Sequence, residues 1–194
     1  MANILDQFKS RLSSGGVRSN QFQILLSFPT WVANRDQAAT DGNFLCNSAT
    51  LPKHTVGVTP MKFRGRELQL AGDSRTFEAW STTIINDDFL IYQAFEAWQE
   101  GINEMETNNQ PKIRPDDYKA IIDVRQLDRA GNAIKTFHLH GAFPNDISAI
   151  DLGFETDDTI QEFDISFVYD YFTTDNLSGA ETTGVSYEGH SGNT

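Results

Sequence analysis

The sequence predicts a mainly β protein, an antiparallel β-sandwich or rolled barrel of about eight strands with one packed α-helix. Most segments alternate apolar and polar residues with the period of two that a half-buried strand requires. A single segment instead carries apolar residues at helical spacing. No linker divides the 194 residues, so we expect one main domain.

The first strand and a hairpin follow from this alternation. Near the N-terminus, one face of a strand carries Phe22, Ile24, Leu26 and Phe28. Residues 118–128 and 132–142 flank the sequence DRAGN, whose glycine and asparagine are typical of a turn. We therefore expect these two segments to pair as an antiparallel hairpin.

The last predicted strand covers residues 159–172. One face carries Phe163, Ile165, Phe167, Tyr169 and Tyr171. The other face carries Glu162, Asp164, Ser166 and Asp170. This pattern is typical of a long antiparallel strand with an apolar face on the core and an acidic face in water.

The predicted helix covers about residues 87–101. Its apolar stripe consists of Ile91, Phe95, Trp98 and Ile102. Asn86 or Asp87 can cap its start, and Gly101 can end it.

The two ends of the chain differ from its centre. Residues 1–19 contain a short amphipathic segment that ends at a Gly-Gly pair. Residues 20–172 form the predicted β domain. Residues 173–194 are rich in Ser, Thr and Gly, which predicts a flexible polar tail.

The stretch FRGRELQLAGD, residues 63–73, admits two functions. A glycine-rich loop can hold a phosphate, but it needs a helix N-terminus behind it. Here another strand-like segment follows instead. The alternative is an irregular arm over about residues 52–73, which ends in a short strand with a turn at Gly72-Asp73. Such an arm buries little in a monomer, so we expect it to pair with a neighbouring subunit.

This arm provides the predicted subunit interface. Leu68 and Leu70 share one face of its strand, and basic residues precede them. The predicted interface residues are Arg64, Arg66, Leu68, Leu70, Asp73 and Arg75.

The charge argues against a DNA-binding protein. The formal net charge is −12, whereas binding to phosphates requires a basic surface. Residues 1–80 contain nine Lys and Arg against six Asp and Glu, and residues 81–194 contain six against twenty-one. Charge that serves solubility explains this pattern, but ends of opposite sign also favour head-to-tail association.

Candidates for catalysis or metal binding are few. Cys46, the only cysteine, lies in a predicted strand and is assigned a buried structural role. His138 and His140 share a strand face, but no third metal ligand has convincing spacing. Adjacent carboxylates such as Asp87 and Asp88 suit helix caps better than acid–base catalysis. No triad signature, Walker loop or dinucleotide fingerprint occurs. We therefore predict no catalytic, cofactor-binding or metal-binding residues.

Several of these segments together resemble the tail tube proteins of contractile-tailed, T-even-like phages, over about residues 20–172. The order and spacing of LAGD-x-RTF-x-x-W, followed by Asn-Asp before the helix, make the resemblance moderately specific. The residues that carry it are Ala49-Thr50-Leu51-Pro52, Leu70–Phe77, Trp80, Asn86-Asp87, Trp98-Gln99, Gly141–Pro144 and Phe163-Asp164-Ile165.

The resemblance implies a fold shared with type VI secretion tube proteins and a structural role without catalysis or cofactors. It implies that six subunits form a ring with a continuous inner barrel, and that rings stack into a tube inside a contractile sheath. The implied partners are the sheath, baseplate and tail terminator proteins, with DNA passing through the tube unbound and no membrane anchor. The protein would be assembled in the host cytoplasm and reside in the virion.

The acidic strand face supplies the candidate lumen residues, Glu162, Asp164 and Asp170. Two alternatives stay open at this point. One is the tube of a secretion machine or of a DNA-free phage-tail-like particle, with the same fold and another cargo. The other is a β-sandwich binding module of a virion. An enzyme would depend on His138 and His140 alone.

Overall fold

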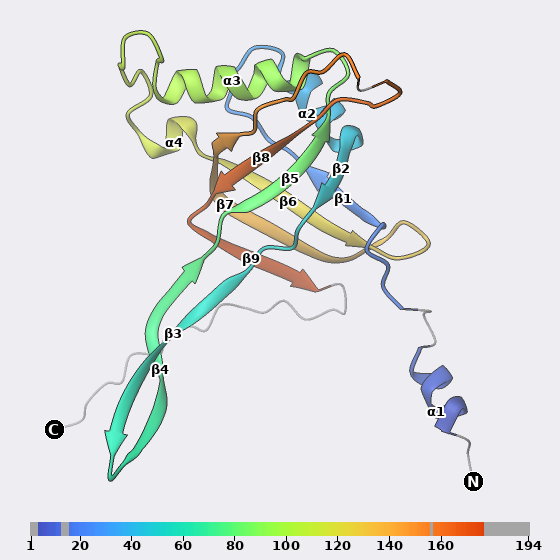
Figure 1. Ribbon diagram of the computed structural model, residues 1–194, viewed down its shortest axis with the longest axis vertical. Helices are drawn as coiled ribbons and strands as arrows, with labels where there is room; N and C mark the ends of the chain where they lie inside the picture. The colour runs from blue at the N-terminus through green and yellow to red at the C-terminus, as the bar shows by residue number, and fades with distance from the viewer. Residues whose placement is uncertain (1–3, 13–15, 156, 177–194) are drawn as a thin grey trace, which may run out of the picture.

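The protein is a rolled antiparallel sheet with α2, α3 and α4 at one end and a long hairpin projecting from the other, and α1 lies at the hairpin end (Figure 1). The computed structural model describes residues 4–12, 16–155 and 157–176. The elements are α1 (Ile4–Arg11), β1 (Phe22–Leu25), α2 (Arg35–Leu45), β2 (Cys46–Ala49), β3 (His54–Phe63), β4 (Arg66–Phe77), β5 (Trp80–Ile85), α3 (Leu90–Ile102), α4 (Pro115–Tyr118), β6 (Ala120–Leu127), β7 (Ala133–Ile147), β8 (Glu162–Val168) and β9 (Tyr171–Asn176).

The main sheet confirms the predicted antiparallel β fold. Its strand order is β1-β6-β7-β8-β5-β2, and β9 also pairs with β7. The long strand β7 pairs with β9 through residues 135–140 and with β8 through residues 143–147, so it belongs to both halves of the roll. Gly141 lies where the pairing changes. Its φ is +68°, a backbone conformation that favours glycine, and the Asp170 carboxylate occupies the space beside it. The predicted hairpin forms as β6 and β7.

Aromatic side chains from β5, β8 and α3 form the centre of the core. Alternate residues of β5 and β8 point inward, and α3 places its predicted stripe against them. The largest fully buried side chains are Trp80, Phe95, Trp98, Phe163 and Phe167. Burial of such rings is a large part of the free energy that stabilises the fold.

The predicted long strand over residues 159–172 is two strands. Phe163, Ile165, Phe167 and Tyr169 are buried as expected, but Tyr171 is half exposed. The chain turns at Asp170 and returns as β9, and Phe172 packs against the core in place of Tyr171. β9 runs to Asn176, so residues 173–176 pair with β7 instead of belonging to the polar tail. The rest of that predicted tail, residues 177–194, lies outside the described residues.

The predicted helix is present as α3 but starts later than residue 87. Phe89 has a φ of +61° and stands just before the first turn. The Asn86 side chain accepts a hydrogen bond from the Phe89 N–H, and Asp88 accepts one from Leu90. Asn86 and Asp88 therefore accept hydrogen bonds from the backbone where the chain enters the helix.

The expectation of a single packed helix was wrong, because α2 also packs on the sheet beside α3. Its buried residues are only Ala38 and Gly42, so it has no large apolar stripe that a sequence pattern would reveal. An added Cβ at Gly42 would lie 2.7 Å from Leu26, which shows how closely the helix approaches β1. The predicted strand around Cys46 is therefore half helix, with residues 43–45 ending α2.

Cys46 itself is half-buried, and its Sγ lies 2.9 Å from the Thr82 hydroxyl. Burial raises the pKa of this thiol, which outweighs its hydrogen bonds to Thr82 and Ser48. A thiol held protonated in this way is a poor nucleophile.

Candidate assembly surfaces

The hairpin of β3 and β4 is a separate two-stranded sheet that projects from the body of the molecule (Figure 1). Arg64 and Gly65 form its two-residue turn, with φ of +46° and +80°. Positive φ at both positions matches the twist of a tight hairpin. The predicted irregular arm over residues 52–73 is thus a regular hairpin over residues 54–77, and the predicted turn at Gly72-Asp73 lies within β4 instead.

Gly72 has a different role from the predicted one. The strand pairing shifts between Val56 and Val58, where β4 bulges. An added Cβ at Gly72 would lie 2.9 Å from backbone atoms of Gly57, so the two strands meet there at a distance that only glycine permits.

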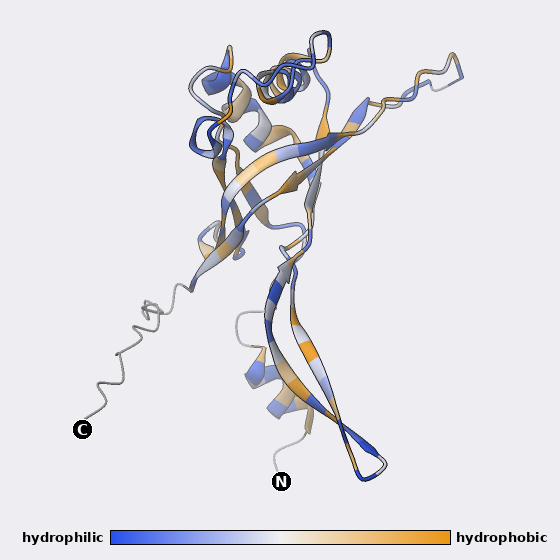
Figure 2. Ribbon diagram, turned by 90° about the vertical axis from the view of Figure 1, so that its left-hand side faces the viewer, coloured by the Kyte–Doolittle hydropathy of each residue, from blue (hydrophilic) through white to orange (hydrophobic). Residues whose placement is uncertain are grey.

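One face of the hairpin is apolar. Met61 pairs with Leu68 across the strands, and Thr59 pairs with Leu70. Cross-strand partners lie on the same face, and alternation adds Phe63. We call Met61, Phe63, Leu68 and Leu70 the hairpin apolar face. All four side chains are exposed, and the apolar segments are visible along the hairpin in Figure 2. Exposed apolar side chains grouped in this way mark an interaction surface.

The structure places all the predicted interface residues on this hairpin. Arg64 lies at its turn, and its guanidinium is 5.4 Å from the centre of the Phe63 ring. Arg66 alternates onto the same side as Leu68 and Leu70. Arg75 pairs with Val56 beside the bulge, and Asp73 lies within the bulge. The sequence therefore grouped residues that lie on one hairpin, although it did not reveal that β3 forms the other half of that hairpin.

Two of the three candidate lumen residues share one polar sheet face. Glu162 accepts a hydrogen bond from Asn47, and Asp164 accepts one from Thr83, at 2.7 and 2.6 Å. Asp170 lies apart from them, because Lys119 holds both of its carboxylate oxygens at 2.7 and 2.8 Å. The acidic face thus consists of Glu162 and Asp164.

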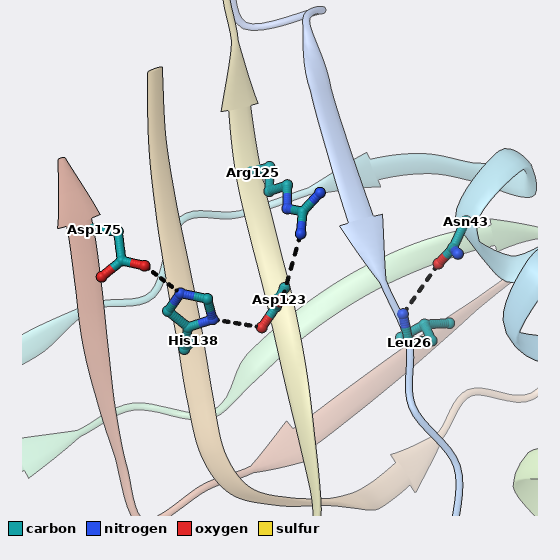
Figure 3. Close-up of polar contacts among 6 residues, drawn as sticks. All are labelled: Leu26, Asn43, Asp123, Arg125, His138 and Asp175. Atoms are coloured by element: carbon teal, nitrogen blue, oxygen red, sulfur yellow. Dashed lines mark hydrogen bonds and ion pairs between the residues drawn. The ribbon is translucent and has the colours of Figure 1, made fainter. Parts of the chain in front are cut away.

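His138 bridges three strands (Figure 3). Its Nδ1 lies 2.7 Å from Asp123 on β6, and its Nε2 lies 2.9 Å from Asp175 on β9. His140 instead bonds Thr173 and stacks on Tyr171. Among the described residues no group of three His, Cys, Asp or Glu is placed to hold a metal ion. These two histidines therefore join β7 to its neighbours.

The bridge favours the charged imidazole, because only the protonated ring donates to both carboxylates. Burial lowers the pKa of His138, but the hydrogen bonds to Asp175 and Asp123 outweigh it, so the pKa lies above its ordinary value. The bridge therefore stabilises the fold fully below the unfolded-state pKa of about 6.5. This stabilisation is lost as pH rises through the higher folded-state pKa.

We predict that His138→Gln lowers the free energy of unfolding by roughly 1 kcal/mol at pH 5.5, and by progressively less as the pH rises to 9. Urea unfolding across that range measures the difference. In a background of Asp123→Asn with Asp175→Asn, the same substitution should show little pH dependence. If the loss of unfolding free energy were the same at every pH with Asp123 and Asp175 present, the bridge would not depend on a charged imidazole.

The sequence patterns missed one exposed segment between β7 and β8, described over residues 148–155 and 157–161. Leu152, Phe154 and Ile160 are all strongly exposed there. The available signal was three large apolar residues in an acidic segment without alternation.

The α1 helix likewise exposes its predicted apolar residues, including Ile4 and Phe8. No helix in the described ranges combines the length and apolarity needed to cross a membrane.

Comparison with known proteins identifies the family of this chain. Residues 17–175 match the family model for phage tail tube protein. The tail tube protein of Serratia phage KSP90 is 31% identical over 168 residues, which cover 85% of this chain and 93% of that protein. Tail tube protein gp19 of Enterobacteria phage T4 is 29% identical over 157 residues, covering 80% and 90%.

Among solved structures, the fold is similar to a chain of the PVC sheath–tube complex in its extended state, an extracellular contractile injection system. The TM-score is 0.56 at 15% identity, and the match covers 87% of this chain and 97% of that one. At this identity the likeness concerns the fold.

Proposed function

Because this chain belongs to the phage tail tube protein family, we propose that six copies close into a ring and that these rings stack into the hollow tube of a contractile tail. As a member of that family the protein is a structural component of the virion and not an enzyme. The observation that carries the proposal is the projecting hairpin, whose apolar face has no partner surface within the described subunit.

The sheet supports closure into a ring. β1 and β2 end the path of strands, and β9 pairs only with β7 among the described strands. These strands leave backbone N–H and C=O groups available for pairing with another chain. Closing the sheet across subunits into one barrel removes such edges.

The partners follow from the position of a tube in the tail. A similar fold occurs in a sheath–tube complex, which supports contact of the outer wall with a sheath protein. Baseplate and tail terminator proteins would bind the two ends of the tube.

Electron microscopy of the purified protein tests the proposal. We expect rings with six-fold symmetry and stacks of such rings. A protein that stays monomeric at high concentration, or rings of another symmetry, would contradict it.

We propose that Glu162 and Asp164 face the bore and that DNA passes through it. Carboxylates repel phosphates, so an acidic wall would keep DNA from adhering during passage. The tight pairing of Asp170 with Lys119 leaves that carboxylate with the least free charge of the three.

Phages carrying Glu162→Gln with Asp164→Asn should eject DNA more slowly than the parent. Fluorescence of released DNA measures the rate. Asp170→Asn is the matched control and should change the rate less. Equal ejection rates in all three phages would mean that this face does not line the DNA path.

A further inference from the structure

The hairpin of β3 and β4 joins the body of the subunit through two short connections, residues 50–53 and 78–79. Lys53 and Glu78 link these connections to each other, through an ion pair at 2.7 Å and a hydrogen bond between their backbones. Both charged side chains are more than half exposed, so the ion pair adds little to stability. In the described part of the chain the hairpin pairs with no strand of the main sheet. The direction in which it projects therefore depends on side-chain packing at its root.

One ring of β9, Phe172, packs against that root. His54 and Phe77 are the paired residues at which the hairpin begins and ends. The centre of the Phe172 ring lies 5.4 Å from that of His54 and 5.7 Å from that of Phe77. The same ring lies 5.9 Å from Phe137 and 6.4 Å from Tyr169, which belong to the body. Phe172 thus links the hairpin to the core where β9 passes the start of β3 (Figure 1).

The strand that carries this ring lies at an edge of the sheet. Among the described strands, β9 pairs only with β7. His138 adds side-chain hydrogen bonds, because its imidazole lies 2.9 Å from Asp175 of β9 and 2.7 Å from Asp123 of β6 (Figure 3). His140 adds a further hydrogen bond, to a threonine hydroxyl of β9. The position of Phe172 therefore depends on how firmly these contacts hold β9 against β7.

We propose that β9 is a clamp, which fixes the direction of the hairpin through Phe172 and is kept closed by the charged His138 bridge. The clamp is a property of the single subunit, whereas its use in assembly rests on the proposed function. A hairpin that already points in one direction loses less conformational freedom when its subunit joins a tube. Only the fraction of subunits in the competent conformation can add to the tube.

The clamp should open as the pH rises. The charged groups that face His138 are Asp123 and Arg125 from β6 and Asp175 from β9, with His140 beside it on β7. Burial of His138 lowers its pKa, but the hydrogen bonds to the two carboxylates outweigh burial and raise the pKa above its ordinary value. The bridge is therefore complete below about pH 6.5 and weakens as the pH rises through the folded-state pKa.

Pulsed electron paramagnetic resonance tests the clamp in dilute, unassembled protein. Spin labels at Gln69→Cys in the hairpin and Glu96→Cys on α3, in a Cys46→Ser background, report the distance between the hairpin and the body. Both label sites are exposed. This labelled parent should give one narrow distance distribution at pH 5.5. Phe172→Ala should broaden it, with about tenfold more hairpins outside the main distance, because two ring contacts with the root are lost.

Two further variants separate the clamp from a general loss of structure. Tyr171→Ala removes the neighbouring ring of β9, which stacks on His140, and should leave the distribution narrow. His54→Ala removes one contact of Phe172 from the hairpin side and should broaden the distribution less than Phe172→Ala does. Because His54 is exposed, this variant keeps the core of the body intact. Narrow distributions from Phe172→Ala and His54→Ala, or equal broadening by Tyr171→Ala, would overturn the inference.

A pH series tests the part played by His138. Between pH 5.5 and pH 9 the fraction of displaced hairpins should rise about fivefold in the labelled parent. It should stay constant in Asp123→Asn with Asp175→Asn, where the imidazole has lost both carboxylates. That background keeps His54, so it also controls for titration of the histidine at the hairpin root. A parent distribution that does not change with pH would overturn the role of His138 in the clamp.

Tube formation tests the use of the clamp in assembly. In a dilution series followed by electron microscopy, Phe172→Ala should need about tenfold more protein than the wild type to form tubes, since only clamped subunits add. Wild-type protein that forms neither rings nor tubes contradicts the proposed function, while the spin-label distances still decide the clamp. Wild-type and Phe172→Ala tubes that appear at the same protein concentration overturn the use of the clamp in assembly.

Discussion

A variant with Leu68→Asp and Leu70→Asp is expected to fold normally and to form no tubes. Both side chains are about half exposed in the isolated subunit, so their replacement removes little from its core. In a tube they would be buried against a neighbour, where each leucine contributes about 1.5–3 kcal/mol. An aspartate in that contact would add the cost of burying a charge. Every subunit would lose this free energy of contact, so we expect no tubes to form.

Thermal unfolding and electron microscopy together measure this result. The matched control is Gln69→Asp with Ala71→Asp, which adds the same charge to the same strand on its opposite face. We expect that control to assemble. Normal tubes from the leucine variant would contradict the assignment of the hairpin apolar face, and loss of tubes from both variants would mean that both faces are covered.

The hairpin shows what the sequence could reveal and what it could not. The alternation around Leu68 and Leu70 correctly predicted a strand, but the partner of that strand is β3 of the same subunit and not a neighbouring chain. The sequence contains two glycines that can each form a turn, Gly65 and Gly72, and only the strand pairing shows that the first one does so. The apolar face combines residues of β3 and β4 that are seven apart, such as Met61 and Leu68, so no local pattern displays it.

Two other elements show the same limit. The α3 helix was predictable because its buried side chains are large and regularly spaced. The α2 helix was not predictable, because its buried residues are Ala38 and Gly42. These two residues are small enough to let the helix pack closely, but they do not form a large apolar stripe in the sequence. The acidic residues 162 and 164 were correctly grouped by alternation. Asp170 was not, because a turn in the backbone moves it to Lys119.

The second large effect concerns the core, and Phe167→Ala is expected to lower the free energy of unfolding by about 3–5 kcal/mol. Phe167 is fully buried. Its ring centre lies 5.6 Å from that of Trp80, 5.8 Å from that of Phe95 and 6.4 Å from that of Trp98. These rings come from β5 and α3, which cannot close over the space left by a phenyl group without moving.

Urea unfolding of the purified subunit measures the loss, with Val168→Ala as the control. Val168 is the next residue on the same strand but points to the opposite face and is 37% exposed, so its truncation should cost about 1 kcal/mol or less. Similar losses for the two variants would mean that the aromatic cluster does not form the centre of the core.

The two sets of variants also separate folding from assembly. Since Phe167 touches no proposed subunit contact, a Phe167→Ala protein kept below its unfolding temperature should still form tubes, whereas the Leu68→Asp, Leu70→Asp protein should fold and form none.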